Sequence, residues 1–99
     1  MPIFRFQAAK SQATLHLIHF ILYSRSYCHL CDDLLQALQA MPQVEGLPVE
    51  VVDVDADDAL LRAYDELVPV LIGVGTDGVG SALCHYFLDV QAVAAFLAG

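Results

Sequence analysis

Basic residues are scarce in this 99-residue chain. Only 4 lysines and arginines stand against 12 aspartates and glutamates, and the formal net charge is −8. A nucleic-acid-binding module needs basic side chains that face phosphates, and electrostatic docking on an anionic membrane needs them as well. The composition therefore argues against both functions, and we expect neither nucleic acid nor a membrane among the partners.

Long apolar runs and paired cysteines are missing too. No segment reaches the ~18–20 apolar residues that a membrane helix requires, since the closest run, residues 15–23, is interrupted by His16 and His19. No small-residue cleavage site follows that run, which argues against a secretory signal. The three cysteines are an odd number, which argues against the closed disulfide framework of a small secreted protein. We expect a cytoplasmic monomer.

Apolar residues, in contrast, are plentiful. They make up 58% of the chain, which excludes intrinsic disorder and is enough for the core of one domain. A regular pattern runs from Leu15 to Leu97 without a linker or a repeat, whereas the first 14 residues have no steady period. We therefore predict an N-terminal extension at residues 1–14 and a domain at residues 15–99.

The apolar periodicity predicts a β-α-β-α-β-β-α order. Runs of β-branched residues indicate buried strands, and apolar positions at i, i+3, i+4 and i+7 indicate helices. A strand–helix–strand unit implies a parallel pair and the later hairpin an antiparallel pair, so the expected fold is α/β, with a mixed four-stranded sheet and helices on both faces. The expected strands lie at 17–23, 49–54, 68–72 and 82–87, and the helices at 28–41, 57–67 and 90–97.

Cys28 and Cys31 stand where the first strand gives way to a helix. Three positions apart in a first helical turn, the two side chains face the same side and lie within reach of a disulfide. The positive end of the helix dipole favours a thiolate on Cys28, and Arg25 adds positive charge. This pattern predicts a nucleophilic, partly exposed Cys28 and a more buried, resolving Cys31.

Two alternatives compete with a redox pair. A structural zinc ion needs four ligands, and the sequence holds neither a second Cys-x-x-Cys nor a spaced histidine pair, so we expect no metal. The pair can also be two small, buried residues at the start of a helix. The four ligands that zinc would have to use are Cys28, Cys31, Cys84 and either His29 or His85.

Cys84 is expected on the fourth strand. Strand alternation places it on one face with Ala82 and Tyr86, and places His85 on the other face. A catalytic Cys84–His85 pair is therefore not expected, and Cys84 is predicted to be an inert core residue.

The segment Tyr27-Cys28-His29-Leu30-Cys31-Asp32, followed some forty residues later by Val68-Pro69, resembles the thioredoxin superfamily. Within it, the chain is similar to small bacterial glutaredoxin-like proteins with a Cys-His-Leu-Cys-Asp motif, over about residues 15–97. The resemblance implies a thioredoxin-like fold and a thiol–disulfide oxidoreductase that acts through Cys28 and Cys31. The alternative is a non-catalytic binding module of the same fold, either a partner adaptor, a redox sensor or a cysteine-ligated metal carrier.

The resemblance also implies how a substrate is held beside the cysteines. It implies a cis Val68–Pro69 bond with Pro69 facing the cysteines, which leaves the Val68 backbone able to pair with an extended substrate chain. Tyr27, His29 and Leu30 are expected to contact the substrate. His29 either stabilises a thiolate when protonated or is simply exposed.

Glutathione recognition is implied for two further residues. Arg25 matches the basic residue that meets a glutathione carboxylate, and Asp89 matches the acidic residue that holds the glutathione amine. Leu67 stands where the family has a threonine, and Phe87-Leu88 stand where it has a glycine pair. The expected partners are a disulfide-containing protein or a glutathione mixed disulfide. No bound cofactor is expected, with glutathione as a possible reductant.

Overall fold

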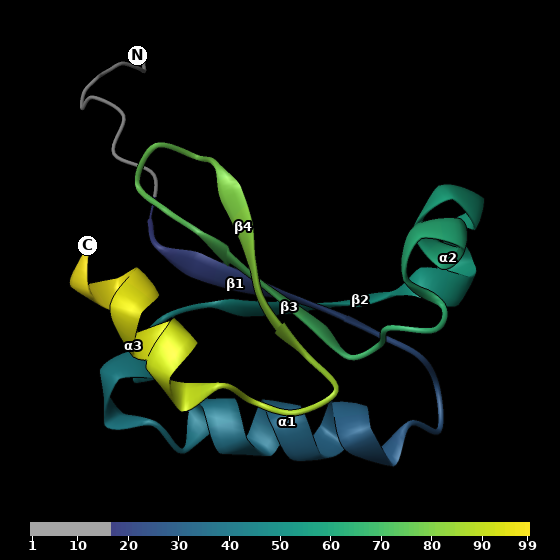
Figure 1. The fold of residues 1–99 in the computed structure, drawn as a ribbon, viewed down its shortest axis with the longest axis horizontal. Coiled ribbons are helices and arrows are strands. Elements are labelled where there is room, and N and C mark those ends of the chain that lie inside the picture. Colours follow the sequence, from purple (N-terminus) through teal and green to yellow (C-terminus); the bar gives the residue numbers. More distant parts are fainter. Residues whose placement is uncertain (1–16) are drawn as a thin grey trace.

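The computed structural model describes residues 17–99, which form one sheet with three α-helices and two 3-10 turns (Figure 1). The extension expected at residues 1–14 lies outside the described residues. Among residues 17–99, no helix combines the length and the apolar character needed to cross a membrane. The elements are β1 (His19–Ser24), α1 (His29–Gln39), η1 (Pro42–Val44), β2 (Val49–Asp53), η2 (Val54–Ala56), α2 (Asp58–Tyr64), β3 (Val70–Val74), β4 (Gly80–His85) and α3 (Val90–Ala98).

The four strands form one mixed sheet in the order β2-β1-β3-β4. The crossover through α1 makes β1 and β2 parallel, whereas β3 runs antiparallel to both of its neighbours. The β-α-β-α-β-β-α order and the mixed sheet predicted from the periodicity are confirmed.

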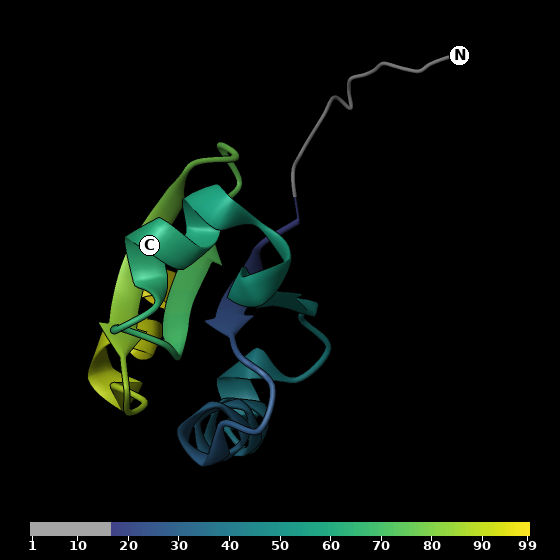
Figure 2. The ribbon, with the colours of Figure 1, turned by 90° about the vertical axis from the view of Figure 1, so that its right-hand side faces the viewer.

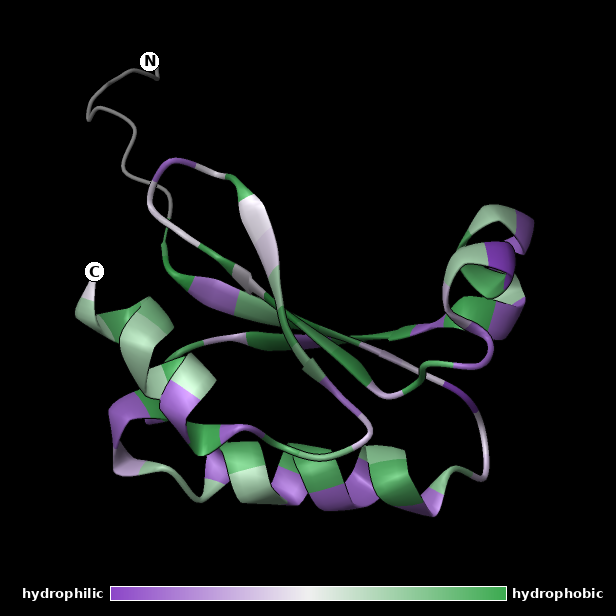
Figure 3. Ribbon diagram, in the orientation of Figure 1, coloured by the Kyte–Doolittle hydropathy of each residue, from purple (hydrophilic) through white to green (hydrophobic). Residues whose placement is uncertain are grey.

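The main core lies between one face of the sheet and the helices α1 and α3. Phe20 and Leu22 of β1 and Leu38 of α1 are at most 1% exposed, and Val93 of α3 is fully buried beside them. Figures 1 and 2 show α1 and α3 on this side of the sheet and α2 on the other side. Figure 3 shows why α1 can lie at the surface, because hydrophobic and hydrophilic residues alternate along it whereas the strands are mostly hydrophobic.

The predicted alternation along the fourth strand is wrong. Leu71 of β3 pairs with Cys84, but the next β3 residue, Ile72, pairs with Ala82, so the strand carries a bulge at Leu83. The extra residue puts Cys84 and Ala82 on opposite faces, with Cys84 packed against the main core. Tyr86 lies beyond the end of β4, with a positive φ of 65°.

The end of β1, the start of β3 and the start of α1 lie at the same end of the sheet. The chain leaves β1 at Ser24 and starts α1 five residues later. Since Tyr23 pairs with Val70 in antiparallel register, the next positions, Ser24 and Pro69, are neighbours at that end of the two strands. The fold therefore brings the residue before β3 close to the start of α1, where both cysteines of the motif lie.

Candidate active site

Cys28 is the N-cap of α1, one residue before the helix begins. Its backbone is extended, with φ −105° and ψ 106°, and its Sγ accepts a hydrogen bond from the Cys31 N–H at 3.3 Å. This is the role that serine or aspartate usually has at a helix start. The sulfur thus meets an otherwise unpaired N–H at the positive end of the helix dipole, where a negative charge is stabilised. Cys28 is partly exposed.

Cys31 differs from Cys28 in its surroundings. Its side chain is only 4% exposed, on the side of α1 that faces the sheet. Burial raises the pKa of the Cys31 thiol to about 11, and the hydrogen bond with Cys28 acts in the same direction. Hydrogen bonds with the Arg25 backbone and the Ser24 side chain oppose the shift. The pair therefore consists of a partly exposed cysteine and a buried one whose thiol stays protonated at neutral pH.

The raised pKa of Cys31 predicts slow alkylation. Because the thiolate is the reactive form, roughly 1% of Cys31 is reactive at pH 9 in the folded protein, against about half for an ordinary thiol with a pKa near 9. In Cys28→Ser protein the burial that is the main cause of the shift remains, so the iodoacetamide rate at Cys31, followed by mass spectrometry, should rise about tenfold per pH unit and level off only above pH 9. The same measurement in urea is the control. A folded-state rate that levels off near pH 9 would contradict the burial argument.

The Val68–Pro69 peptide bond is cis, as the resemblance implies. Pro69 is buried, and its carbonyl accepts a hydrogen bond from the Tyr86 N–H at 2.9 Å. The Tyr86 hydroxyl donates to the Glu66 carbonyl. Two hydrogen bonds from one residue therefore fasten the segment before β3 to the end of β4.

The Val68 backbone is less available than the resemblance implies. Its N–H donates to the Tyr64 carbonyl at 3.1 Å, and the Leu67 N–H donates to the same oxygen at 2.8 Å. Both bonds belong to the turn that closes α2, which uses the N–H before the proline. The expectation that the Val68 backbone is able to pair with a substrate is therefore wrong for its N–H, which this turn already uses.

Arg25 is held by an acidic partner. Its Nη2 lies 3.1 Å from Asp55 Oδ1, and its Nε donates to Asp55 Oδ2 at 3.2 Å. Both side chains are about 40% exposed, and the hydrogen bond with Asp55 raises the pKa of Arg25. The guanidinium charge near the motif is therefore largely compensated, and any anion that binds there must compete with Asp55.

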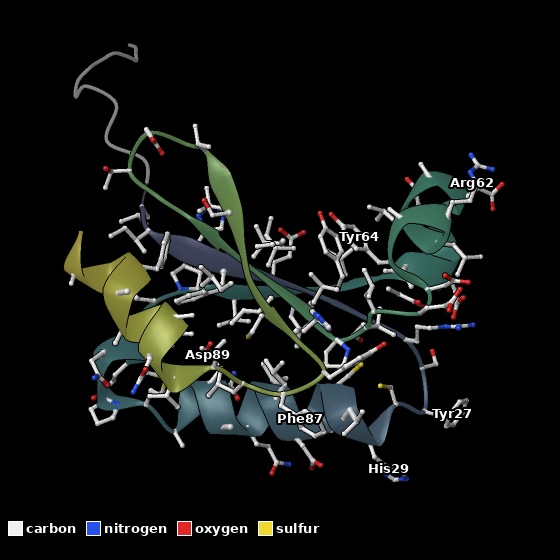
Figure 4. The ribbon with its side chains drawn as sticks, viewed as in Figure 1. Tyr27, His29, Arg62, Tyr64, Phe87 and Asp89 are labelled. Carbon is white, nitrogen blue, oxygen red and sulfur yellow. The ribbon has the colours of Figure 1, made fainter. Side chains whose placement is uncertain are left out.

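Of the remaining predicted residues, three belong to the motif itself and Asp89 lies at the start of α3. Tyr27 is fully exposed with a positive φ of 60°, and Leu30 is partly exposed. Figure 4 shows Tyr27 and His29 pointing outward from the start of α1. Nothing in that placement favours contact of His29 with the Cys28 sulfur. Asp89 caps α3, since its Oδ1 accepts the Ala92 N–H at 3.0 Å.

The four-ligand zinc alternative finds no support in the geometry. Within residues 17–99, no group of three or more histidine, cysteine, aspartate or glutamate side chains gathers closely enough to hold a metal ion. Two aspartates at and beyond the end of β2 serve the backbone instead: Asp53 accepts the Asp55 N–H, and Asp57 accepts the N–H groups of Ala59 and Leu60.

Sequence reasoning missed Ser24, Asp55 and Tyr86. Ser24 follows Phe20 and Leu22 at alternate positions of β1, so strand periodicity alone could have placed it on the face that α1 covers. Asp55 reaches Arg25 because the parallel register of β1 and β2 aligns Ser24 with Asp53, and no local sequence pattern specifies that register. No sequence pattern indicated Tyr86, because its contacts depend on the bulge in β4 and on its positive φ.

Solved structures of other proteins are similar to this chain in their fold. Protein Ne2328 from Nitrosomonas europaea is 30% identical, with a TM-score of 0.69, over 83% of this chain and 93% of its own. Protein XcR50 from X. campestris is 33% identical, with a TM-score of 0.56, over 80% and 95%. A malarial protein shares the fold alone, at 16% identity and a TM-score of 0.54, over 84% and 96%.

The family comparison agrees with these structures. No curated protein matches the chain. The family described as glutaredoxin-like domain (DUF836), however, matches residues 19–98, which include both cysteines of the motif and Pro69. The thioredoxin-like fold implied by the motif is confirmed, and the chain belongs to the glutaredoxin-like domain family.

Proposed function

We propose that this protein is a thiol–disulfide oxidoreductase that acts through Cys28 and Cys31. The observation that carries the proposal is the difference between the two sulfurs. One is partly exposed at a helix start and accepts a backbone N–H, while its neighbour is buried with a pKa raised to about 11. That difference suits a nucleophile that is used first and a second thiol that is held back.

The proposed reaction has two exchange steps. In the first, the Cys28 thiolate attacks one sulfur of a substrate disulfide, so that a bond from Cys28 to that sulfur forms and the other substrate sulfur leaves as a thiolate that takes up a proton. In the second, Cys31 loses its proton and attacks the Cys28 sulfur, so that the bond from Cys28 to the substrate breaks and the second substrate sulfur leaves as a thiolate that takes up a proton. The substrate is then a dithiol and the protein a disulfide, which two molecules of glutathione, or one dithiol, must reduce.

The residues expected to contact the substrate differ in whether they are still available to bind it. The Val68 carbonyl next to Pro69 is the backbone group offered to an extended substrate chain, and Tyr27 and Leu30 offer exposed apolar surface. Arg25 and Asp89 already have partners within the protein, Asp55 and the Ala92 N–H. We therefore propose a protein disulfide rather than a glutathione mixed disulfide as the better substrate.

Turnover is the test. We expect reduction of insulin, and slower reduction of a glutathione–peptide mixed disulfide, when purified protein is supplied with glutathione or a dithiol. The rate should scale with protein concentration and exceed that of the reductant alone. Absence of turnover with both substrates and both reductants would overturn the proposal.

A further inference from the structure

A groove runs along α1 beside the connection from β4 to α3. It has a volume of about 300 Å³, and neither cysteine of the motif lines it. Asp33 and Ala37 contribute from α1, and Tyr86, Phe87 and Val90 contribute from the connection and the start of α3. We call this surface the α1 groove.

The walls of the α1 groove are unusually apolar for an exposed surface. The Phe87 side chain is 69% exposed and that of Val90 is 52% exposed. Figure 4 shows Phe87 over α1, between Asp89 at the start of α3 and His29 at the start of α1. Large apolar side chains that cluster around a hollow in this way are typical of contact sites for other molecules.

The groove is continuous with the motif through one face of α1. Leu30, Asp33 and Ala37 follow at i, i+3 and i+7, so they share that face, and Leu30 stands between the two cysteines. Cys28 and Ala37 are nine positions apart, about 14 Å along a helix. An extended chain spans that distance in about four residues. A segment attacked at Cys28 can therefore place a side chain in the groove about four residues from its own cysteine.

The negative charge around the groove favours a basic partner over an anionic one. Asp33 lines it, and the only lysines or arginines within residues 17–99 are Arg25 and Arg62. Arg25 is paired with Asp55, and Arg62 lies on α2 across the sheet (Figure 4). An anion such as glutathione therefore finds no compensating charge there, whereas a basic group is attracted.

We propose that the α1 groove is a docking subsite for a protein partner. It takes a large apolar side chain about four residues from the partner's reactive cysteine, and a neighbouring lysine or arginine faces Asp33. This inference rests on the proposed oxidoreductase function and narrows its substrate class to proteins with a basic, apolar segment beside the disulfide.

Peptide disulfides provide the test. In each peptide a single cysteine is joined to cysteamine. On both sides of that cysteine, the residue four away is Phe or Ala, and the residue three away, which lies nearer Asp33, is Lys or Glu. The two peptides are called Phe-Lys and Ala-Glu. Wild-type protein should favour the Phe-Lys peptide about tenfold in kcat/KM, mainly through KM. Phe87→Ala should remove most of that preference, and Asp33→Asn should reduce it about threefold.

Matched controls lie elsewhere on the surface. Val79→Ala removes an apolar side chain that is 61% exposed in the β3–β4 hairpin, and Asp58→Asn removes one negative charge at the start of α2. Both should keep the wild-type preference. Equal rates for the two peptides, or an unchanged preference in Phe87→Ala protein, would overturn the docking subsite while leaving the oxidoreductase function intact.

Binding without chemistry separates the two proposals. In Cys28→Ser/Cys31→Ser protein, the Phe-Lys peptide with serine in place of its cysteine should shift backbone amide signals of Asp33, Ala37 and residues 86–90 in an NMR titration. Such shifts support the subsite even if no disulfide is turned over. An absence of shifts, or shifts of equal size with the Ala-Glu peptide, would overturn it.

Discussion

Cys31→Ser protein is expected to accumulate as a mixed disulfide between Cys28 and one of the two parts of the substrate disulfide, whereas Cys28→Ser protein is expected to form no adduct. Cys28 makes the first bond in the proposed reaction, and Cys31, in the same helical turn, is placed to break it. Removing the nucleophile should lower turnover more than about 100-fold. Intact-mass analysis after mixing with a disulfide peptide measures the adduct, and an insulin assay measures the turnover.

Both substitutions should leave the fold intact. Serine is a preferred N-cap, so Cys28→Ser keeps the hydrogen bond to the N–H of residue 31. At position 31 a buried hydroxyl finds the Ser24 side chain and the Arg25 backbone within reach, the groups that already contact the sulfur. An adduct on Cys28→Ser protein, for example through the half-buried Cys84, would contradict the assignment of the nucleophile.

The elements of the fold could be predicted because apolar periodicity and turn residues agree along the chain. Phe20 and Leu22 are buried on the face that the alternation of the first strand indicates, and Leu34 and Leu38 are buried at the expected helical spacing. The end of the first helix was placed too late, at Met41. Its apolar side chain is buried, but the residue before Pro42 takes an extended backbone, so the helix stops at Gln39.

Apart from the cis Val68–Pro69 bond, which the family resemblance implied, the candidate site was predictable only where its residues are close in sequence. The relative position of Cys28 and Cys31 follows from their spacing in the sequence, because they share one helical turn. The pair of Arg25 with Asp55 spans 30 positions and depends on the register of two strands, which no local pattern specifies. The Val68 N–H is used by a turn that the apolar pattern around it does not encode. Long-range pairings of this kind decide which site residues are available to a ligand.

Phe20→Ala protein is expected to lose about 3–5 kcal/mol of unfolding free energy. Phe20 lies in β1, which pairs with both β2 and β3, and its side chain is fully buried. Its ring packs edge-on against Phe96 of α3 at a centroid distance of 5.7 Å. Alanine would leave a cavity where the sheet meets that helix. Urea unfolding followed by far-UV circular dichroism measures the loss, with Phe20→Leu, which leaves a smaller cavity and should cost less than Phe20→Ala, as the milder variant.

Phe87→Ala provides the matched comparison, because it removes the same atoms from a ring that is 69% exposed. Little apolar area returns to water and no cavity forms, so the loss should stay within about 0.5 kcal/mol. A loss similar to that of Phe20→Ala would mean that the Phe87 ring supports the fold. A small loss together with impaired peptide preference would mean that the exposed ring is retained for binding, because it then stabilises nothing within the protein itself.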